Sequence, residues 1–350
     1  MTATIGILLA TFNGAGYLPA QLQSIAAQTH RDWHLTVRDD GSDDDTPAIL
    51  AAFARAHPGR VSVVRDDRGR LGPLGNFNRL LGMAREPYLA FADQDDVWRP
   101  RKLERALVRI RALEAAQPAG RPCLVHADRA VVDASGREIA PSYWRSRGLG
   151  ASDFGSFESH LAFCMAAGSA MLVNRPLADL AHPVPSAARM YDCWIELVAN
   201  AVGAVAWIDE IALDHRRHGA NTSGSARDNS SRAARRPLAR AARLLRNLST
   251  QRGVQATYFR QADAFRRLHG TRMDPRMLDN LERFLSLPGR GLPRRVHGLV
   301  KSGSAPPGVA RALVFAALAR PLEVGVGGVD REAAVSSSRT GLMAARDKAA

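Results

Sequence analysis

The sequence predicts an α/β fold in which a mostly parallel sheet is flanked by helices, followed by a basic helical C-terminal extension. Over the first hundred residues, short apolar runs alternate with amphipathic segments of helical period, and polar clusters follow the apolar runs. After residue 225, segments rich in Arg, Ala and Leu are broken by Pro and Gly. The chain has 350 residues and 46% hydrophobic content, which is ample apolar material for such a core.

Residues 4 to 92 justify the parallel sheet. Their apolar runs are nearly continuous, as expected for strands covered on both faces, and the segments between them carry one apolar helical stripe each. The expected strands span residues 4–10, 33–39, 61–66 and 88–92, and the expected helices span 17–28, 46–57 and 76–84. This β-α-β-α-β-α-β order gives a parallel sheet because crossover connections are right-handed.

The following residues are less regular. They predict a helix over 99–110, a hairpin over 123–139, a strand within 168–175, a helix over 191–203 and strands over 204–209 and 211–215. We place a domain boundary near residue 225. Residues 1–225 then form a catalytic domain, 226–335 a basic helical region and 336–350 a tail with the composition of a disordered segment.

The composition limits the class of protein. Three cysteines without a CxxC pair suit neither a disulfide framework nor a zinc site, and they indicate a reducing cytoplasm. The N-terminus lacks the basic region and cleavage site of a signal peptide, and no apolar stretch reaches the ~18 residues of a membrane span. We therefore expect a cytoplasmic protein that is neither exported nor integral to a membrane.

The net charge of +14 is divided unevenly along the chain. Residues 216–350 hold 26 basic and 9 acidic side chains, whereas residues 1–215 hold 22 basic and 25 acidic ones. Arg-rich helices with apolar faces favour an anionic membrane surface, and the scarcity of aromatic residues among them argues against nucleic acid. A solvated appendage or a dimer contact is the remaining alternative.

Polar clusters follow three of the expected strands: TFNG, DDGSDDDT and DQDD. Ligands of such sheets collect outside the carboxyl ends of the strands, so these three loops converge on one rim. Asp93 and Asp95, followed by Asp96, offer the oxygen ligands that Mg²⁺ or Mn²⁺ accepts, and a D-x-D spacing in extended backbone sends both side chains to one face. The alternative is a solvated acidic turn in which Asp96 caps the next helix.

Three further residues stand where a ligand would lie. Asp39 could accept hydrogen bonds from a ribose hydroxyl or a base, Asp192 opens a helix close to Trp194, and His218 lies in a Gly/Asn-rich loop. The ring of Trp194 could stack on a sugar, and His218 could bind metal or phosphate. The ordinary alternatives are a turn residue, a helix N-cap and a surface histidine.

A second reading rests on NGAG after the first strand, with Asp39 roughly 20 residues later, as in a dinucleotide fingerprint. It would make the chain an NAD(P)-dependent oxidoreductase. However, Pro19 occupies the position of the third glycine, and this reading gives DQDD no role.

Taken together, the motifs resemble those of family 2 glycosyltransferases, most of all the bacterial rhamnosyltransferase-like branch that builds O-antigen and related polysaccharides. The motifs are ILLATFNGAGYLPAQLQSIAAQT, VRDDGSDDDT, LGNFNRLL, FADQDDVWRPRKLERAL, GSAMLVNR, YDCWIEL and DHRRHGANTSG, and they span about residues 4–225. The resemblance implies a GT-A fold, a nucleotide-diphosphate sugar donor, and Mg²⁺ or Mn²⁺ on Asp93 and Asp95 with His218 nearby. It also implies a nucleotide pocket with Thr11, Asn13, Asp39, Asp40 and Asn76.

The same resemblance implies that Asp192 is the catalytic base, in a motif usually written His-Asp-Trp-Trp. Tyr191 and Cys193 replace the His and the first Trp here, and Tyr191 and Trp194 are the expected acceptor contacts. One base without a second nucleophilic carboxylate at the sugar predicts direct displacement with inversion. The expected partners are the sugar nucleotide, a lipid-linked saccharide acceptor and the inner-leaflet surface, with a homodimer left open and nucleic acid not expected.

Overall fold

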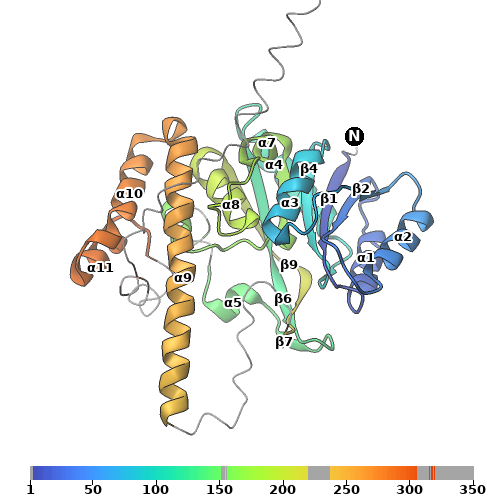
Figure 1. Cartoon of the computed structure of the whole chain (residues 1–350). Helices are drawn as coiled ribbons and strands as arrows, with labels where there is room; N and C mark the ends of the chain where they lie inside the picture. The colour runs from blue at the N-terminus through green and yellow to red at the C-terminus, as the bar shows by residue number, and fades with distance from the viewer. Residues whose placement is uncertain are drawn as a thin grey trace, which may run out of the picture. The chain divides into compact units, whose positions relative to one another are not determined.

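The computed structural model describes residues 3–150, 154, 156–219, 237–305, 315, 317 and 319, without the side chains of 237–252. It confirms the parallel sheet expected for the first hundred residues, whose strands lie in the order β3-β2-β1-β4. Figure 1 shows β2, β1 and β4 of this sheet. These strands are β1 (Ile5–Thr11), β2 (Trp33–Asp39), β3 (Val61–Val64) and β4 (Tyr88–Asp93). The helices between them are α1 (Leu18–Ala26), α2 (Thr46–Ala56) and α3 (Gly72–Met83).

Local sequence explains where the first elements begin. β1 is buried along nearly its whole length, as its continuous apolar run predicts. Helix α1 has Pro19 in its first turn, where a missing N–H costs nothing, and it buries Leu18, Leu22 and Ile25 on one face. Helix α2 starts at Thr46, whose N–H donates to the Asp44 carboxylate 2.9 Å away.

The sheet continues beyond β4 through mixed pairings. β8 (Met171–Asn174) is antiparallel to β4 and to β6 (Cys123–Val132), β9 (Ala204–Arg216) is parallel to β6, and β5 (Val97–Trp98) is antiparallel to β9. The expected hairpin is present, because β7 (Glu138–Ala140) pairs antiparallel with β6.

The two strands expected at 204–209 and 211–215 are one strand, and this prediction was wrong. Ala127 pairs with Ile208 but Asp128 pairs with Ile211, so Asp209 and Glu210 form an irregularity within β9. Extra residues in one strand of a pair bend the strand without ending it, and the two acidic residues here have the composition of a turn.

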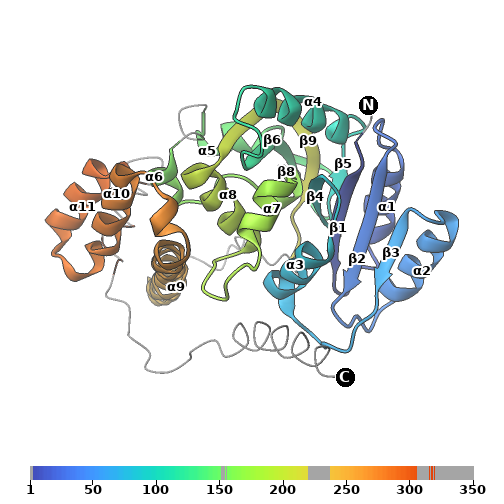
Figure 2. The ribbon, with the colours of Figure 1, turned by 90° about the horizontal axis from the view of Figure 1, so that it is seen from above.

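Helices cover both faces of the sheet (Figure 2). Helices α1, α2 and α4 (Lys102–Ala115) share one apolar core with β1, whereas α3, α7 (Arg175–Ala181) and α8 (Tyr191–Val202) lie on the opposite face. The short helices are α5 (Tyr143–Arg147) and α6 (Phe157–His160), and the 3₁₀ turns are Gly168–Ala170, Gly270–Arg272 and Leu287–Gly289. Asp96 does not cap the helix after it, because β5 intervenes and α4 begins at Lys102 with Arg101 at its N-cap.

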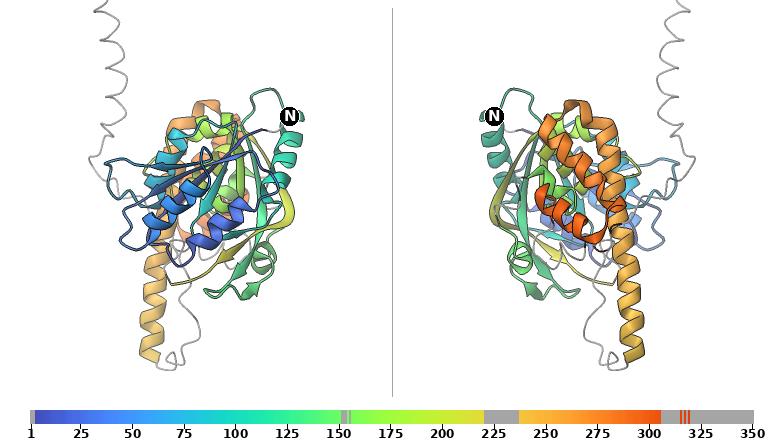
Figure 3. Two further views of the ribbon diagram at one scale, coloured as in Figure 1. Left: turned by 90° about the vertical axis from the view of Figure 1, so that its right-hand side faces the viewer. Right: turned by 90° about the vertical axis from the view of Figure 1, so that its left-hand side faces the viewer.

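Three helices follow in the C-terminal part: α9 (Pro237–His269), α10 (Pro275–Leu285) and α11 (Leu292–Lys301). Phe259 of α9 stacks on Phe284 of α10 with ring centroids 4.6 Å apart, and Figure 3 shows α10 and α11 beside α9. Phe265 of α9 meets Trp194 of α8 edge to face. The boundary expected near 225 and the tail 336–350 lie outside the described residues. Within the described part of the chain, the helices include none that is long and apolar enough to cross a membrane.

Candidate active site

A cavity of about 770 Å³ lies at the carboxyl ends of β1 and β4, bounded by the start of α8 and the residues after β9. Ligand pockets span about 300–1,000 Å³, so its volume suits a ligand larger than a single sugar. Most residues predicted from the sequence line it: Thr11, Asn13, Asp40, Asn76, Asp93, Asp95, Tyr191, Asp192 and His218. Two predicted residues are not part of its lining, namely Asp39 and Trp194.

Asp39 lies behind Thr11. Its Oδ1 accepts hydrogen bonds from Thr11 Oγ1 at 2.7 Å and Ser42 Oγ at 2.6 Å, and its Oδ2 accepts one from the Ser42 N–H. Asn13, next along the rim, has a φ of 47°, a backbone conformation that Asn adopts more readily than most residues. The carboxylate of Asp39 thus shapes the turn that supports Thr11 and Asn13.

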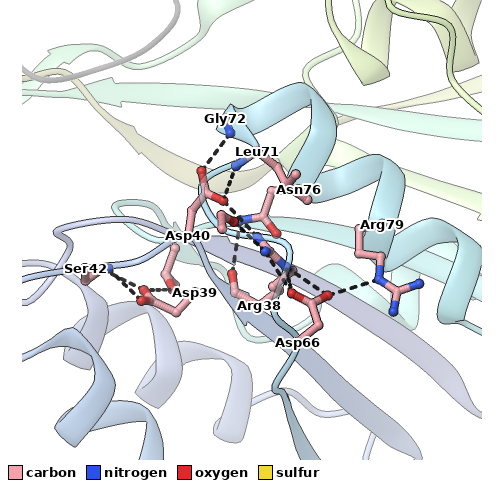
Figure 4. A network of polar contacts seen from close by, with 11 residues as sticks. Arg38, Asp39, Asp40, Ser42, Asp66, Leu71, Gly72, Asn76 and Arg79 are labelled. Atoms are coloured by element: carbon pink, nitrogen blue, oxygen red, sulfur yellow. Dashed lines mark hydrogen bonds and ion pairs between the residues drawn. The ribbon is translucent and has the colours of Figure 1, made fainter.

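A buried cation organises the neighbouring wall (Figure 4). Arg38 is 3% exposed, and its guanidinium donates to Asp40 at 2.8 Å and to Asp66 at 3.0 Å. The two Asp40 oxygens also accept the backbone N–H groups of Leu71 and Gly72, where α3 begins. Asp40 therefore satisfies amides that a helix start leaves unpaired, and its carboxylate lies where a helix dipole favours negative charge.

Asn76 lines the cavity and is buried. Its Nδ2 donates to the Arg38 carbonyl at 3.1 Å, whereas its buried Oδ1 has no hydrogen-bond partner among the residues that the structure describes. Leaving a buried acceptor unpaired costs about 1–3 kcal/mol, and a ligand N–H or hydroxyl would satisfy it. Arg70, which the sequence did not single out, also lines the cavity with its guanidinium 3.7 Å from the Phe12 ring centroid.

The acidic corner forms at the end of β4. Asp93 is the last residue of that strand, but Gln94 and Asp95 form a turn, so the expectation of an extended D-x-D was wrong. Both carboxylates line the same cavity nonetheless. Burial, together with the nearby Asp96, Asp95 and Asp192 charges, raises the pKa of Asp93 well above its ordinary value. The carboxylate of Asp93 accepts no hydrogen bond from the side chains and backbone that the structure describes.

The other two aspartates of the motif have histidine partners. Asp95 Oδ2 lies 2.8 Å from His218 Nε2, and the His218 ring stacks on Tyr17 with centroids 4.6 Å apart. Asp96 is fully buried, and its Oδ1 lies 3.0 Å from His215 Nδ1. The pairing separates the motif into Asp93 and Asp95 at the cavity and Asp96 within the fold.

Asp93, Asp95 and His218 all line the cavity, and carboxylate oxygens are the kind of ligand that a hard divalent cation prefers. Their ligand atoms are not a compact group, however: among the residues that the structure describes, the three metal-ligating side chains with atoms within 4.8 Å of one another are Cys164, Asp192 and Cys193. Burial and the neighbouring carboxylates together raise the pKa of Asp93, and a cation bound beside it would oppose both effects.

Gln94 has a structural role that the sequence analysis missed. Its Nε2 donates to the Phe12 carbonyl and its Oε1 accepts the Phe12 N–H, both at 2.8 Å, which ties the end of β1 to the end of β4. A Cβ on Gly14 would lie 2.3 Å from Gln94 Oε1, whereas one on Gly16 would meet nothing within 4 Å. Contact with Gln94 therefore explains Gly14 without a dinucleotide.

Asp192 faces the cavity from the first turn of α8. Its Oδ2 accepts the Gly168 N–H at 3.1 Å and its Oδ1 accepts the Cys193 N–H at 2.8 Å, while Met190 occupies the N-cap position. Burial raises the pKa of Asp192 above its ordinary value. A carboxylate of raised pKa that lines a cavity has the properties of a general base.

Tyr191 and Trp194 differ in position. Tyr191 lines the cavity and stacks on Phe77 with centroids 4.0 Å apart. Trp194 is 1% exposed, and its indole N–H donates to the Ala181 carbonyl at 2.9 Å. The prediction that Trp194 contacts a sugar was wrong. Residues two apart on a helix point to different faces, and the Trp194 side chain points toward α9.

Glu196, one turn after Asp192, is another residue that the sequence analysis missed. It is 1% exposed and accepts the N–H groups of Met165 and Ala166, and its Oε1 lies 3.1 Å from His160 Nε2. Although burial opposes the charge, His160 lowers the pKa of Glu196. This pair anchors the segment that leads to Gly168, the donor to Asp192.

Residues 7–167 match the sequence model of the family described as Glycosyl transferase family 2. The uncharacterized glycosyltransferase alr2836 of Nostoc sp. strain PCC 7120 is 26% identical over 226 residues, which cover 63% of this chain and 67% of that protein. The dTDP-rhamnosyl transferase RfbG of Shigella flexneri is 31% identical over 102 residues, 28% of this chain and 35% of that protein.

The UDP-Glc:alpha-D-GlcNAc-diphosphoundecaprenol beta-1,3-glucosyltransferase WfgD of Escherichia coli is 30% identical over 100 residues, 29% of this chain and 38% of that protein. The chain thus spans well under half of RfbG and of WfgD. The names of these two relatives differ in donor sugar, so the similarity does not single out a rhamnosyl branch.

Solved structures resemble the fold. S. aureus TarS 1-349 in complex with UDP-GlcNAc has a TM-score of 0.54 at 13% identity, covering 85% of this chain and 80% of that one. The mannosyltransferase PcManGT from Pyrobaculum calidifontis, in complex with GDP-Man and Mn²⁺, has a TM-score of 0.52 at 15% identity, covering 98% and 81%. The oxidoreductase alternative is not favoured by these similarities or by Gly14. Together these similarities indicate a glycosyltransferase with the GT-A fold, in which residues 7–167, somewhat under half of the chain, match the family 2 model.

Proposed function

We propose that the protein transfers a sugar, with L-rhamnose as one candidate, from a nucleotide-diphosphate donor to a hydroxyl of a lipid-linked saccharide during polysaccharide biosynthesis. The observation that carries this proposal is the single cavity in which Asn76, Asp93, Asp95 and Asp192 meet. It joins the polar side chain of Asn76, the acidic corner and the half-buried carboxylate of Asp192, which would contact a nucleotide, a diphosphate and a reacting hydroxyl in turn. Relatives named for a dTDP-rhamnosyl donor and a diphosphoundecaprenol acceptor support these two substrate classes.

In the proposed reaction, Asp192 accepts the proton of the acceptor hydroxyl as its oxygen attacks the anomeric carbon. The new C–O bond forms as the bond from that carbon to the diphosphate breaks, and the diphosphate leaves with the electron pair. A single displacement of this kind inverts the anomeric configuration. The raised pKa of Asp192 favours proton transfer near neutral pH, a contribution of typically ~10²–10⁴-fold.

A divalent cation, Mg²⁺ or Mn²⁺, would be held by Asp93, Asp95 and His218. When bound, it neutralises the charge on the departing diphosphate. The relative complexed with GDP-Man and Mn²⁺ supports this class of ion. Thr11, Asn13 and Asn76 would contact the nucleotide, with Asp39 and Asp40 holding the wall in shape.

The test compares the wild type with Asp192→Asn and with Asp43→Asn, a control on an exposed carboxylate of the DDGSDDDT loop. Donors are first screened by thermal shift with Mn²⁺, using dTDP-rhamnose, UDP-glucose, UDP-galactose and GDP-mannose. We expect Asp192→Asn to keep the donor-induced shift and to lose transfer by about 10²-fold or more, while Asp43→Asn keeps both. Full transfer by Asp192→Asn would refute the assignment of the base.

We also propose that the basic C-terminal helices hold the enzyme at the inner surface of the cell membrane. Residues 290–301 contain four cations and no acidic residue, and the side chains of Leu292 and Val300 are 48% and 66% exposed. Apolar side chains beside cations are typical of helices that lie on anionic lipid. A lipid-linked acceptor would be reached from the same surface.

A further inference from the structure

We propose that Cys164, Cys193 and Asp192 form a second metal site, selective for a thiophilic divalent cation such as Zn²⁺. The two sulfur atoms and an Asp192 carboxylate oxygen lie within 4.8 Å of one another. Tetrahedral zinc sites place Zn–S bonds at about 2.3 Å and Zn–O bonds at about 2.0–2.2 Å. Ligand atoms at this spacing therefore need only a small contraction to reach one ion.

The surrounding contacts hold the three ligands in place. Glu196 accepts the N–H groups of Met165 and Ala166, which fixes the chain immediately after Cys164. Asp192 and Cys193 are consecutive in the first turn of α8, and the Cys193 N–H donates to Asp192 Oδ1. Ligands that are positioned before binding lose little conformational freedom when the ion enters.

Charge and access also favour the site. Two thiolates and one carboxylate around a divalent ion give a net charge of −1, and Arg189 Nη1 lies 3.6 Å from Cys193 Sγ to offset it. Asp192 lines the large cavity, which provides a path for the ion and room for a water as fourth ligand. Binding is balanced by the release of the two thiol protons to solvent.

Ligand chemistry separates this site from the acidic corner. Asp93, Asp95 and His218 offer mainly oxygen, which suits Mg²⁺ and Mn²⁺, whereas thiolates select zinc and related ions. This inference rests on the proposed function in one respect only: an ion on Asp192 occupies the proposed base. We therefore expect Zn²⁺ to inhibit transfer in a way that excess Mn²⁺ does not relieve.

The experiment titrates the reduced full chain with Co²⁺ under anaerobic conditions, after a thiol count has given all three cysteines. Co²⁺ replaces Zn²⁺ and gives a near-ultraviolet thiolate-to-cobalt absorption that does not depend on catalysis. We expect this absorption to saturate at one ion per chain, to be displaced by Zn²⁺, and to be lost in Cys164→Ser and Cys193→Ser. Cys123→Ala is the matched control, because Cys123 is a fully buried cysteine in the sheet core, and it should keep the absorption.

Absence of the thiolate absorption in the wild type would overturn the site, as would its persistence in Cys193→Ser. Failure of the proposed function gives a different pattern. If the absorption is present but Zn²⁺ leaves transfer unchanged, the metal site stands and the role of Asp192 as base is refuted.

Discussion

Gly168 packs closely against two residues that line the cavity, Tyr191 and Asp192. A Cβ on Gly168 would lie 2.0 Å from the Tyr191 hydroxyl oxygen, and Gly168 also donates its N–H to Asp192. One small residue thus sets both the ring that lines the cavity and the carboxylate beside it. The sequence analysis included Gly168 only as the first residue of the motif GSAMLVNR and did not predict its contact with Tyr191 and Asp192, because the contact joins segments that are distant along the chain.

We predict that Gly168→Ala lowers transfer by about 10-fold or more while the chain stays folded. The added methyl group must displace Tyr191 from Phe77, and a displacement of about 1 Å in an active site can reduce the rate by up to 10²-fold. The measurement is kcat and KM with the best donor. Gly16→Ala is the control, since its Cβ would meet nothing within 4 Å, and equal losses in both variants would contradict the prediction.

A second residue-scale prediction concerns pH. Hydrogen bonds from Arg38 hold the pKa of Asp66 at about 2, below its ordinary 3.8. A carboxyl whose pKa is lowered by folding stabilises the fold above its unfolded pKa, and this contribution is lost as the pH falls toward 2. The difference in free energy of unfolding between wild type and Asp66→Asn should therefore narrow between pH 5 and pH 3.

Urea denaturation at several pH values measures this difference. Asp67→Asn removes an exposed carboxylate at the next position and serves as the control. If the wild type remains more stable than Asp66→Asn by a constant free energy of unfolding down to pH 3, the ionised carboxylate of Asp66 is not the source of that stability.

Single elements were predictable to the extent that their pattern is local. The strands and helices up to residue 92 follow from periodicity alone, since each apolar run is short and each is bounded by polar or Gly/Pro residues. The two-residue strand β5 was missed because its length carries no period. The irregularity in β9 was predicted to separate two strands, because only the pairing with β6 shows that the strand continues.

The site was predictable as a set of loops but not as a set of contacts. The rule that strand ends converge brought Thr11, Asp93 and Asp95 together correctly. It could not show that Asp96 turns toward His215, or that Trp194 turns toward α9. Those orientations are decided by tertiary packing.

Helix α4 carries Lys102, whose positive charge is disfavoured by burial more than its neighbours favour it. Burial lowers the pKa of Lys102 to about 7, and its ammonium lies 3.5 Å from the Trp98 ring centroid. Because the folded pKa is below that of the unfolded chain, stability rises with pH between about 7 and 10. We predict that Lys102→Met raises the melting temperature by about 2 °C or more at pH 6.5 and by less at pH 9.5.

Thermal unfolding at both pH values tests this prediction. Lys301→Met, at an exposed position of α11, should change the melting temperature little at either pH. A stabilisation by Lys102→Met of equal size at pH 6.5 and 9.5 would mean that the charge is not its cause.

At the scale of the whole molecule, the proposed membrane surface makes a further prediction. Arg294→Glu with Lys301→Glu should weaken binding to anionic vesicles by at least about 10-fold, since each basic residue near such a surface contributes about 1 kcal/mol. Wild-type binding should also fall as salt rises. Co-sedimentation with phosphatidylserine-containing and neutral vesicles measures both effects.

Arg145→Glu with Arg147→Glu is the matched control, because it makes the same change of charge at exposed positions of α5. Equal losses in the two double variants would indicate a response to net charge rather than to α11. If the wild type binds neutral vesicles as tightly as anionic ones, its membrane binding is not electrostatic.

The placement of Asp192 and Trp194 on different faces of α8 has one last consequence. The carboxylate is fastened to Gly168 on one side, and the indole is wedged against Ala181 and Phe265 on the other. Rotation of α8 about its own axis would break both sets of contacts at once, so these contacts hold the helix in one orientation. In the proposed reaction, the acceptor hydroxyl would therefore approach a carboxylate whose position is set before any substrate binds.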